Sequence, residues 1–338
     1  MAIAGIKEYD TQGGQKPKDQ SRKSMIRSHS NLFEKALGRN SPVVLDGGLA
    51  TELESQGIDI GTKLWSAALL RSNPSAIVAA HRAYLEAGAE IIISASYQAS
   101  QAGLMSLGLS EQQADDLIVS SVELACTARK QFLDKHPETT FMPIVAASIG
   151  PYGAVLHDGS EYTGNYDIDE ASLRRFHERR LTLLDQTDAD VLACETIPNN
   201  LEASVLCELL TDVGLPAWVS FSCRDGRCIS DGTPLQQVAT SFREHSRVLA
   251  LGVNCTAPHF IASLIGEIKA GAADKAVIVY PNSGEKYDAS SNSWFGTVSP
   301  VDCAAAAQNW RDAGAKIIGG CCRIGPQHIA ALREQLTA

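Results

Sequence analysis

The chain has 338 residues, of which 44% are hydrophobic and 20% are charged, with 27 Gly and 13 Pro. This is the composition of a globular protein, and it excludes long disordered, collagen-like and coiled-coil architectures. The net charge of −10 argues against a general nucleic-acid binder, because phosphate binding needs a basic face, and no apolar run approaches the roughly 18 residues of a membrane span.

The first 40 residues differ from the rest in charge. They carry eight Lys/Arg and four Asp/Glu, a net of +4, which leaves −14 for residues 41–338. We expect residues 1–40 to form a mobile tail, with an organelle-targeting segment as the less favoured interpretation because of the acids. A secretory signal is not recognisable, and nine cysteines do not suit a secreted disulfide framework. We therefore expect a cytoplasmic protein with reduced cysteines.

From residue 41 onward, short apolar runs rich in β-branched residues alternate with segments of helical period. Such runs are typical of strands buried on both faces of a parallel sheet. The predicted strands are 43–46, 90–95, 143–148, 191–195, 217–222, 248–255, 276–281 and 316–320. The predicted helices are 73–87, 110–135, 169–188, 200–213, 234–246, 258–272, 300–313 and 326–336.

Eight βα units in about 300 residues predict a TIM (β/α)8 barrel over residues 41–338. The main alternative is a doubly wound open sheet. A dinucleotide-binding version of that sheet is weakened because no Gly-x-Gly-x-x-Gly follows the first strand.

In a TIM barrel, catalytic groups lie at the carboxyl ends of the strands. Two acids, a glycine pair and three cysteines hold such positions. They are Asp46, Gly47, Gly48, Glu195, Cys255, Cys321 and Cys322.

The three cysteines can meet above the barrel rim. Adjacent cysteines rarely bridge each other, but a backbone bend, for which Gly319-Gly320 supply freedom, lets both bind one metal. Strands six and eight are near neighbours in a barrel, so Cys255 can reach the same point. Three thiolates suit zinc and leave a fourth position open. The alternative is that these small side chains simply fill the top of the barrel, and spacing alone does not decide between the two.

A zinc ion with three thiolates carries a net charge of −1, which makes it a poor generator of hydroxide. It is better suited to hold an incoming thiol as a reactive thiolate, so the site favours alkyl transfer to a thiol over hydrolysis. Asp46 and Glu195 could hold a substrate ammonium group. The alternative for each acid is a helix cap or a salt bridge at the rim.

Residues 41–335 resemble the homocysteine S-methyltransferase family. The motifs that carry the resemblance are DGGLATELE at 46–54, LWSA at 64–67, SASYQA at 94–99, GPYGA at 150–154, DGSEY at 158–162, CETIPN at 194–199, GVNC at 252–255, YPNSGE at 280–285 and GGCCR at 319–323.

The resemblance implies a zinc-dependent enzyme that makes methionine from homocysteine. Cys255, Cys321 and Cys322 would bind Zn²⁺, and the homocysteine sulfur would take the fourth position. Thr196 departs from the betaine-type branch, in which a tyrosine follows the matching glutamate, so the fourth ligand without substrate is not assigned.

For the rest of homocysteine, the resemblance implies that Asp46 and Glu195 bind the amino group. Backbone N–H groups near Gly47 and Gly48 would help to bind the carboxylate.

The stretches at 158–162 and 280–285 look most like the branch that uses S-methylmethionine or S-adenosylmethionine. A sulfonium donor suits an aromatic wall, for which Trp65, Tyr97 and Trp294 are candidates. Alternatives are a betaine-type methyltransferase and a non-catalytic barrel that binds zinc and a thiol, for instance as a sensor. The expected partners are small molecules, with no nucleic acid and no membrane, and the sequence predicts no oligomeric state.

Overall fold

The computed structural model describes residues 32–60, 65–284, 286–288, 293–295 and 299–337, without the side chains of 65–68, 286–288 and 293–295. Eight strands pair in parallel in the order β1-β10-β7-β6-β5-β4-β3-β2. A bridge between Leu45 and Ile91 joins β1 to β2 and closes the ring. The strands are β1 (Val43–Val44), β2 (Ile91–Ile93), β3 (Ile144–Ile149), β4 (Val191–Ile197), β5 (Ala217–Phe221), β6 (Val248–Asn254), β7 (Ala276–Tyr280) and β10 (Ile317–Ile318).

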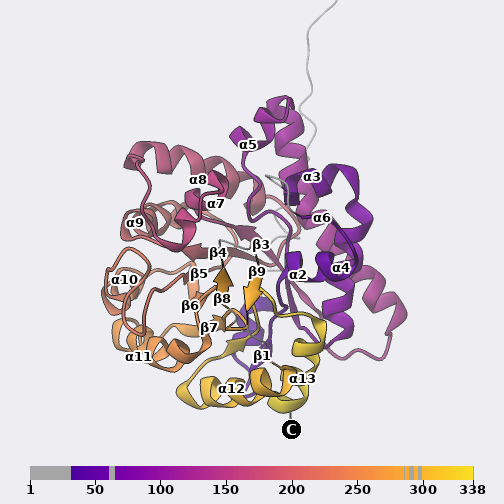
Figure 1. The fold of residues 1–338 in the computed structure, drawn as a ribbon, viewed down its shortest axis with the longest axis vertical. Coiled ribbons are helices and arrows are strands. Elements are labelled where there is room, and N and C mark those ends of the chain that lie inside the picture. The colour runs from indigo at the N-terminus through magenta and orange to yellow at the C-terminus, as the bar shows by residue number, and fades with distance from the viewer. Residues whose placement is uncertain (1–31, 61–64, 285, 289–292, 296–298, 338) are drawn as a thin grey trace, which may run out of the picture.

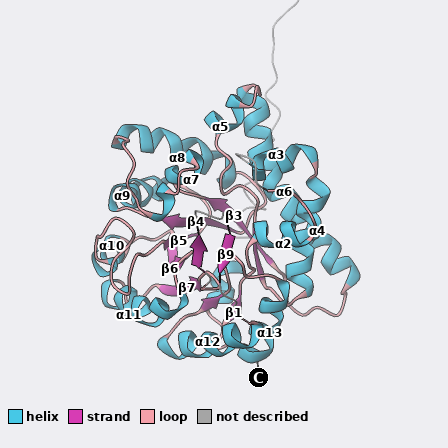
Figure 2. Cartoon of the chain, viewed as in Figure 1, coloured by secondary structure: helices cyan, strands magenta, loops and turns pink. Residues whose placement is uncertain are grey.

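Helices surround the strands as an outer ring, which confirms the predicted TIM barrel and excludes the open sheet (Figure 2). The α-helices are α2 (Leu49–Ser55), α3 (Trp65–Ser72), α4 (Pro74–Glu86), α5 (Gln101–Ser106), α6 (Glu111–Lys135), α7 (Tyr152–Leu156), α8 (Glu170–Asp185), α9 (Asn200–Leu209), α10 (Leu235–Ser241), α11 (Ile261–Gly271), α12 (Pro300–Ala313) and α13 (Pro326–Thr337). Short 3-10 helices are η1 (Ser160–Tyr162), η2 (Leu210–Asp212) and η3 (Pro258–Phe260). A hairpin of β8 (Lys286–Asp288) and β9 (Ser293–Phe295), which the sequence did not predict, lies between β7 and α12.

Side-chain caps fix where several helices begin. Asn73, Ser110 and Asp169 each accept a hydrogen bond from a backbone N–H of the first turn, at α4, α6 and α8. At α6 the side chain of Gln113 also accepts from the backbone N–H of Ser110, which completes a capping box. The helix that precedes β2, α4, contacts the last helix of the ring, α13 (Figure 1). The outer ring of helices is therefore continuous where the first and last βα units meet.

The amino-terminal end of the barrel is sealed by residues 32–37, which are helical. Phe33 is fully buried there, with its ring centroid 5.8 Å from that of Trp218 at the start of β5. The predicted tail boundary at residue 40 is therefore too late, because Phe33 and Ala36 belong to the barrel core. Residues 1–31, the rest of the predicted tail, lie outside the described residues.

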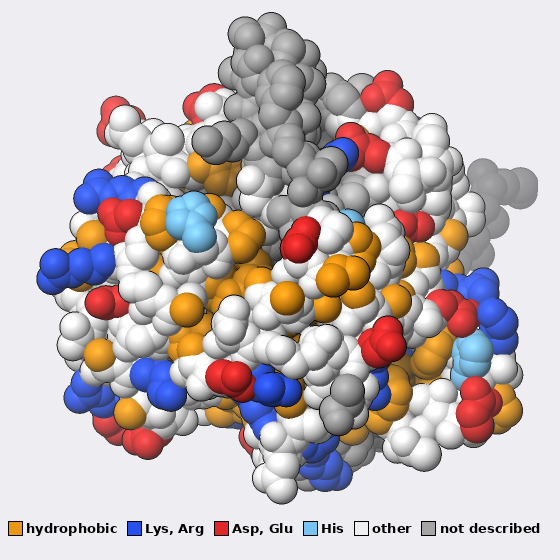
Figure 3. Space-filling view, turned by 60° about the horizontal axis from the view of Figure 1, so that its bottom comes forward, with side chains coloured by type: hydrophobic (Ala, Val, Ile, Leu, Met, Phe, Trp, Pro, Cys, Tyr) orange, Lys and Arg blue, Asp and Glu red, His pale blue; other side chains and the backbone are white. Residues whose placement is uncertain are grey.

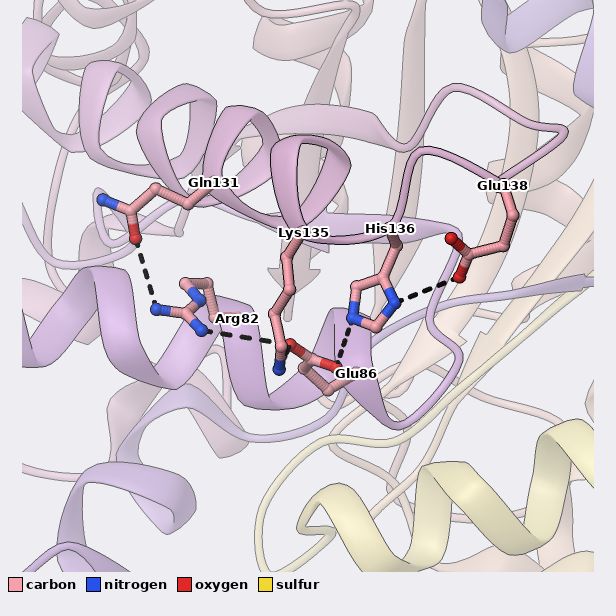
Figure 4. Close-up of polar contacts among 6 residues, drawn as sticks. All are labelled: Arg82, Glu86, Gln131, Lys135, His136 and Glu138. Atoms are coloured by element: carbon pink, nitrogen blue, oxygen red, sulfur yellow. Dashed lines mark hydrogen bonds and ion pairs between the residues drawn. The ribbon is translucent and has the colours of Figure 1, made fainter.

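On the outside of the barrel, Glu86 links α4 to α6 (Figure 4). Its carboxylate lies 2.8 Å from Lys135 Nζ and 2.8 Å from His136 Nε2. Hydrogen bonds from these two side chains lower the pKa of Glu86. Exposed pairs of this kind contribute little to stability.

Acidic and basic side chains are interspersed over the face shown in Figure 3. Among the described residues, no helix is long and apolar enough to cross a bilayer.

Candidate metal and substrate site

A cavity of about 310 Å³ opens at the carboxyl ends of the barrel strands. The side chains predicted from the sequence converge on it from opposite sides of the ring. Those that line it are Asp46, Gly47, Gly48, Tyr97, Glu195, Cys255, Cys321 and Cys322. Trp65 begins α3, but its side chain, like that of Trp294, lies outside the described residues.

The three cysteines gather at one wall of the cavity. Their Sγ atoms all lie within 4.8 Å of one another, and those of Cys255 and Cys322 are 3.7 Å apart. Zinc–sulfur bonds of about 2.3 Å in a tetrahedron separate two sulfurs by about 3.8 Å, so this pair has the spacing of two ligands of one ion. A metal that prefers sulfur therefore fits the cluster.

The structure also joins Cys255 to Cys321 by a disulfide. The disulfide and the metal site exclude each other, because both sulfurs must be thiolates to bind the ion. Cys322 remains a free thiol. The cluster thus has one reduced form that can bind a metal with three sulfurs and one oxidised form that cannot.

The backbone at and beside the cysteine cluster adopts strained conformations. Cys255 and Arg323 have φ values of +46° and +67°, in the left-handed region that non-glycine residues rarely adopt. The N–H of Cys255 donates to Tyr280 O at 3.3 Å, and the N–H of Cys321 donates to Pro281 O at 2.8 Å. Both ligand segments are therefore fastened to the end of β7, which lies between β6 and β10.

Gly319 and Gly320 serve close packing rather than conformational freedom. Neither has a φ in the left-handed region. A Cβ on Gly319 would lie 2.6 Å from Leu45 Cβ, and one on Gly320 would lie 2.2 Å from the Ile324 side chain. The left-handed φ next to the two cysteines therefore belongs to Arg323 and not to this glycine pair, whose close contacts leave no room for side chains.

Asp46 and Glu195 are both buried at the cavity, 3% and 7% exposed. The Ile93 N–H donates to Asp46 Oδ2 at 2.7 Å, and Ser148 Oγ donates to Glu195 Oε1. Burial raises the pKa of Glu195 to about 7, against the opposing hydrogen bonds from Ser148 and Tyr280. Burial, and to a lesser degree the charge of Glu195, also raise the pKa of Asp46.

No Lys, Arg or His of the described chain pairs with either carboxylate. Two buried acids without a cation are costly when ionised, and a bound ammonium group would remove that cost. The alternatives raised for these acids, a helix cap and a rim salt bridge, do not describe their contacts. A cation bound beside them would therefore supply the positive charge that no described side chain provides.

The backbone at Glu195 is bent and braced. The pairing of β4 with β5 shifts register between Cys194 and Ile197, a bulge that redirects the side chains of this segment. Thr196 has a φ of +60°, which is strained for a β-branched residue. Asn254 holds it: Oδ1 accepts from Thr196 N at 2.8 Å, and Nδ2 donates to Thr196 Oγ1 at 2.6 Å.

Asn254 immediately precedes Cys255, so one side chain braces both the carboxylate and the sulfur sides of the site. It is fully buried and also accepts from Ser220 Oγ at 2.9 Å. The sequence places Asn254 in the GVNC motif at 252–255 but predicts no role for it. The bracing role of its side-chain amide becomes apparent only when the fold brings Thr196 next to the Asn254–Cys255 segment.

The glycine pair after β1 allows the backbone to pass close to the cysteines. A Cβ on Gly47 would lie 2.2 Å from Ile324 O, and one on Gly48 would lie 2.7 Å from Cys321 O. The Gly48 N–H donates to Ile324 O at 2.9 Å. This N–H is therefore already used, which corrects the expectation for Gly48 itself and leaves the other backbone N–H groups near the glycine pair, such as those of Gly47 and Leu49, as candidates.

Tyrosines form another wall of the cavity. Tyr97 is half-buried, and its carbonyl accepts from Arg180 Nη2 at 3.0 Å. Arg180 is 1% exposed and also donates to Gly150 O at 2.9 Å, so a buried guanidinium ties the loops after β2 and β3 together. Sequence reasoning missed Arg180 because it lies in the middle of helix α8, far from any strand end.

Comparisons with known proteins were made on the whole chain. A family model described as homocysteine S-methyltransferase matches residues 43–336. The homocysteine S-methyltransferase YbgG of Bacillus subtilis is 47% identical over 290 residues, covering 85% of this chain and 92% of that protein. A selenocysteine Se-methyltransferase of Brassica oleracea var. italica is 42% identical, covering 87% of this chain and 89% of that protein. The crystal structure of the homocysteine methyltransferase MmuM from Escherichia coli in its metallated form is 40% identical, with a TM-score of 0.81, and the match covers 90% of this chain and 100% of that chain.

Proposed function

The chain belongs to the homocysteine S-methyltransferase family, and on that basis we propose that it transfers a methyl group from a sulfonium donor to the sulfur of L-homocysteine, producing methionine. The donor we propose is S-methylmethionine, with S-adenosylmethionine as the second candidate. One observation carries the proposal: three sulfurs and two buried carboxylates, neither of which pairs with a cation among the described residues, line the same cavity. A thiol amino acid would offer its sulfur to the cysteine cluster and its ammonium group to the two carboxylates.

Cys255, Cys321 and Cys322 would hold Zn²⁺, as the chemistry of a three-sulfur donor set supports. When bound, zinc supplies an electron-rich centre that lowers the pKa of a coordinated thiol, so that the homocysteine sulfur is available as a nucleophile near neutral pH. The cluster must be reduced for this, since the disulfide between Cys255 and Cys321 removes two donors. We therefore propose that the protein works in a reducing compartment, the cytoplasm.

Asp46 and Glu195 would bind the homocysteine ammonium group. Each is fixed by a hydrogen bond from a neighbouring strand, so their positions are set before the substrate arrives. A proton held by Glu195 in the empty cavity would leave as the cation enters, because a nearby positive charge favours the carboxylate. Binding the amino group in this way orients the sulfur at the other end of homocysteine. The reaction then depends on aligning that sulfur with the methyl group of the donor.

The donor needs alignment and exclusion of water rather than acid catalysis, because the leaving group is a neutral thioether. Its sulfonium carries a positive charge that suits the face of an aromatic ring. Of the aromatic residues proposed from the sequence, Tyr97 is the one whose side chain the structure describes, and it lines the cavity. Trp65 remains a proposal from the sequence.

Purified protein loaded with zinc, homocysteine and both donors in competition tests the proposal. We expect methionine to form, with S-methylmethionine consumed first. Bound zinc and bound homocysteine without turnover of any sulfonium donor would contradict the proposal and favour the non-catalytic alternative. Turnover with betaine in place of a sulfonium would favour the betaine-type enzyme.

A further inference from the structure

Two further acids line the cavity: Glu54, which forms an ion pair with Arg323, and Glu161 in η1. The Oε2 atom of Glu161 is buried and has no hydrogen-bond partner among the described residues. Burial raises the pKa of Glu161. Leaving a buried acceptor unpaired costs free energy, so an unpaired oxygen at the wall of a ligand-sized cavity is a place for a donor that the ligand brings.

The backbone beneath Glu161 is fixed. Ser222 Oγ donates to the Glu161 carbonyl at 3.0 Å and ties η1 to the end of β5. Gly153 of α7 packs so closely that a Cβ there would lie 2.6 Å from Glu161 N. The carboxylate is therefore presented from a firm support and not from a free loop.

Glu161 lies near both halves of the site. Burial first, and then the charge of Glu161, raise the pKa of Tyr97, with smaller effects of Glu195 and Cys322. Glu161, Tyr97 and Cys322 line the same cavity, as do Asp46 and Glu195.

We propose that Glu161 binds the α-ammonium group of the methyl donor, and so makes the enzyme select amino-acid sulfonium compounds. The inference rests on the proposed function. A sulfonium centre has no N–H or O–H and cannot satisfy the unpaired Oε2, whereas an ammonium group can. The donor must also place its methyl group at the sulfur cluster, and Glu161 lines the same cavity as that cluster.

Two ligands and two variants form the test. S-Methylmethionine and its desamino analogue, dimethyl(3-carboxypropyl)sulfonium, differ only in the amino group. Their dissociation constants are measured by calorimetry on the zinc-loaded protein, its Glu161→Gln variant and its Asp158→Asn variant. Asp158 is the matched control because it is an acid of the same loop that does not line the cavity, and asparagine can still accept from Ser160 N.

We expect loss of the amino group to weaken binding to the wild-type protein by about 10- to 100-fold, as for a charge-assisted hydrogen bond. Glu161→Gln should weaken S-methylmethionine by the same factor and leave the analogue within twofold, while Asp158→Asn changes neither ligand. Equal weakening of both ligands by Glu161→Gln, or none, would overturn the proposal. Homocysteine turnover is followed in parallel: a wild-type protein that binds the donor but makes no methionine counts against the proposed function and not against Glu161.

Discussion

Binding of an ammonium group at Asp46 and Glu195 should release a proton at mildly acidic pH. The pKa of Glu195 is raised by burial to about 7, from an ordinary value of 4.5. A shift of that size corresponds to about 3 kcal/mol of cost for ionising the group in the empty cavity. At pH 6 the group is about nine-tenths protonated, and an arriving cation restores the carboxylate.

Methionine is the ligand of choice for this measurement, because it carries the amino group of homocysteine but has no thiol proton to lose. Calorimetric titration in buffers with different ionisation enthalpies counts the protons released. We expect roughly 0.9 proton per site from Glu195 at pH 6 and roughly 0.1 at pH 8. Glu195→Gln should remove this pH-dependent part of the proton release. Proton release that is zero at pH 6, or unchanged in the variant, would refute the assignment of the ammonium to this carboxylate.

The same pKa shift has a consequence for stability without ligand. Between about pH 4.5 and 7 the folded protein holds a proton on Glu195 that the unfolded chain has lost. The stabilisation that comes from this proton should therefore be fully present below about pH 4.5. The free energy of unfolding should fall as pH rises from there to about 7, by up to about 3 kcal/mol. Urea unfolding of the metal-free protein at pH 5 and pH 8 checks this, and Glu195→Gln should reduce the difference.

Three further outcomes are expected. Cys322→Ser should lower the zinc content well below one per chain, whereas Cys207→Ser, outside the cavity, keeps it; metal analysis decides, and full zinc in the first variant contradicts the ligand set. Asn254→Ala removes three hydrogen bonds of about 1 kcal/mol each and should lower the Tm by roughly 4 °C; an unchanged Tm would show that Thr196 needs no brace. Phe33→Ala should cost about 3–5 kcal/mol in urea unfolding, and a loss under 1 kcal/mol would place the segment outside the cooperative core.

The barrel itself could be predicted from the sequence, because its strands are continuous apolar runs and its helices have clear starts. Position at a strand end was enough to select Asp46, Glu195 and the cysteines, since parallel strands bring their carboxyl ends to one rim. The segment around Phe33 escaped prediction because it is short and follows a polar stretch. Its burial depends on Trp218, which lies 185 positions later in the chain.

Roles that depend on distant neighbours could not be read from the sequence. Nothing local distinguishes Asn254 as the brace of Thr196, or shows that the Gly48 N–H is used by Ile324. Glu161 stood within a recognised motif, yet its unpaired oxygen is visible only when the loop after α7 is packed against β5. Spacing indicates which residues reach the rim, and packing decides which of their atoms remain available.

The central claim is that this cavity moves a methyl group from a sulfonium to homocysteine. Homocysteine labelled with ¹³C in its backbone, incubated with S-methylmethionine and the zinc-loaded protein, tests it by mass spectrometry of the products. We predict one labelled methionine from homocysteine for each unlabelled methionine left by the donor. Absence of labelled methionine with either sulfonium donor, from protein that retains its zinc, would contradict the account.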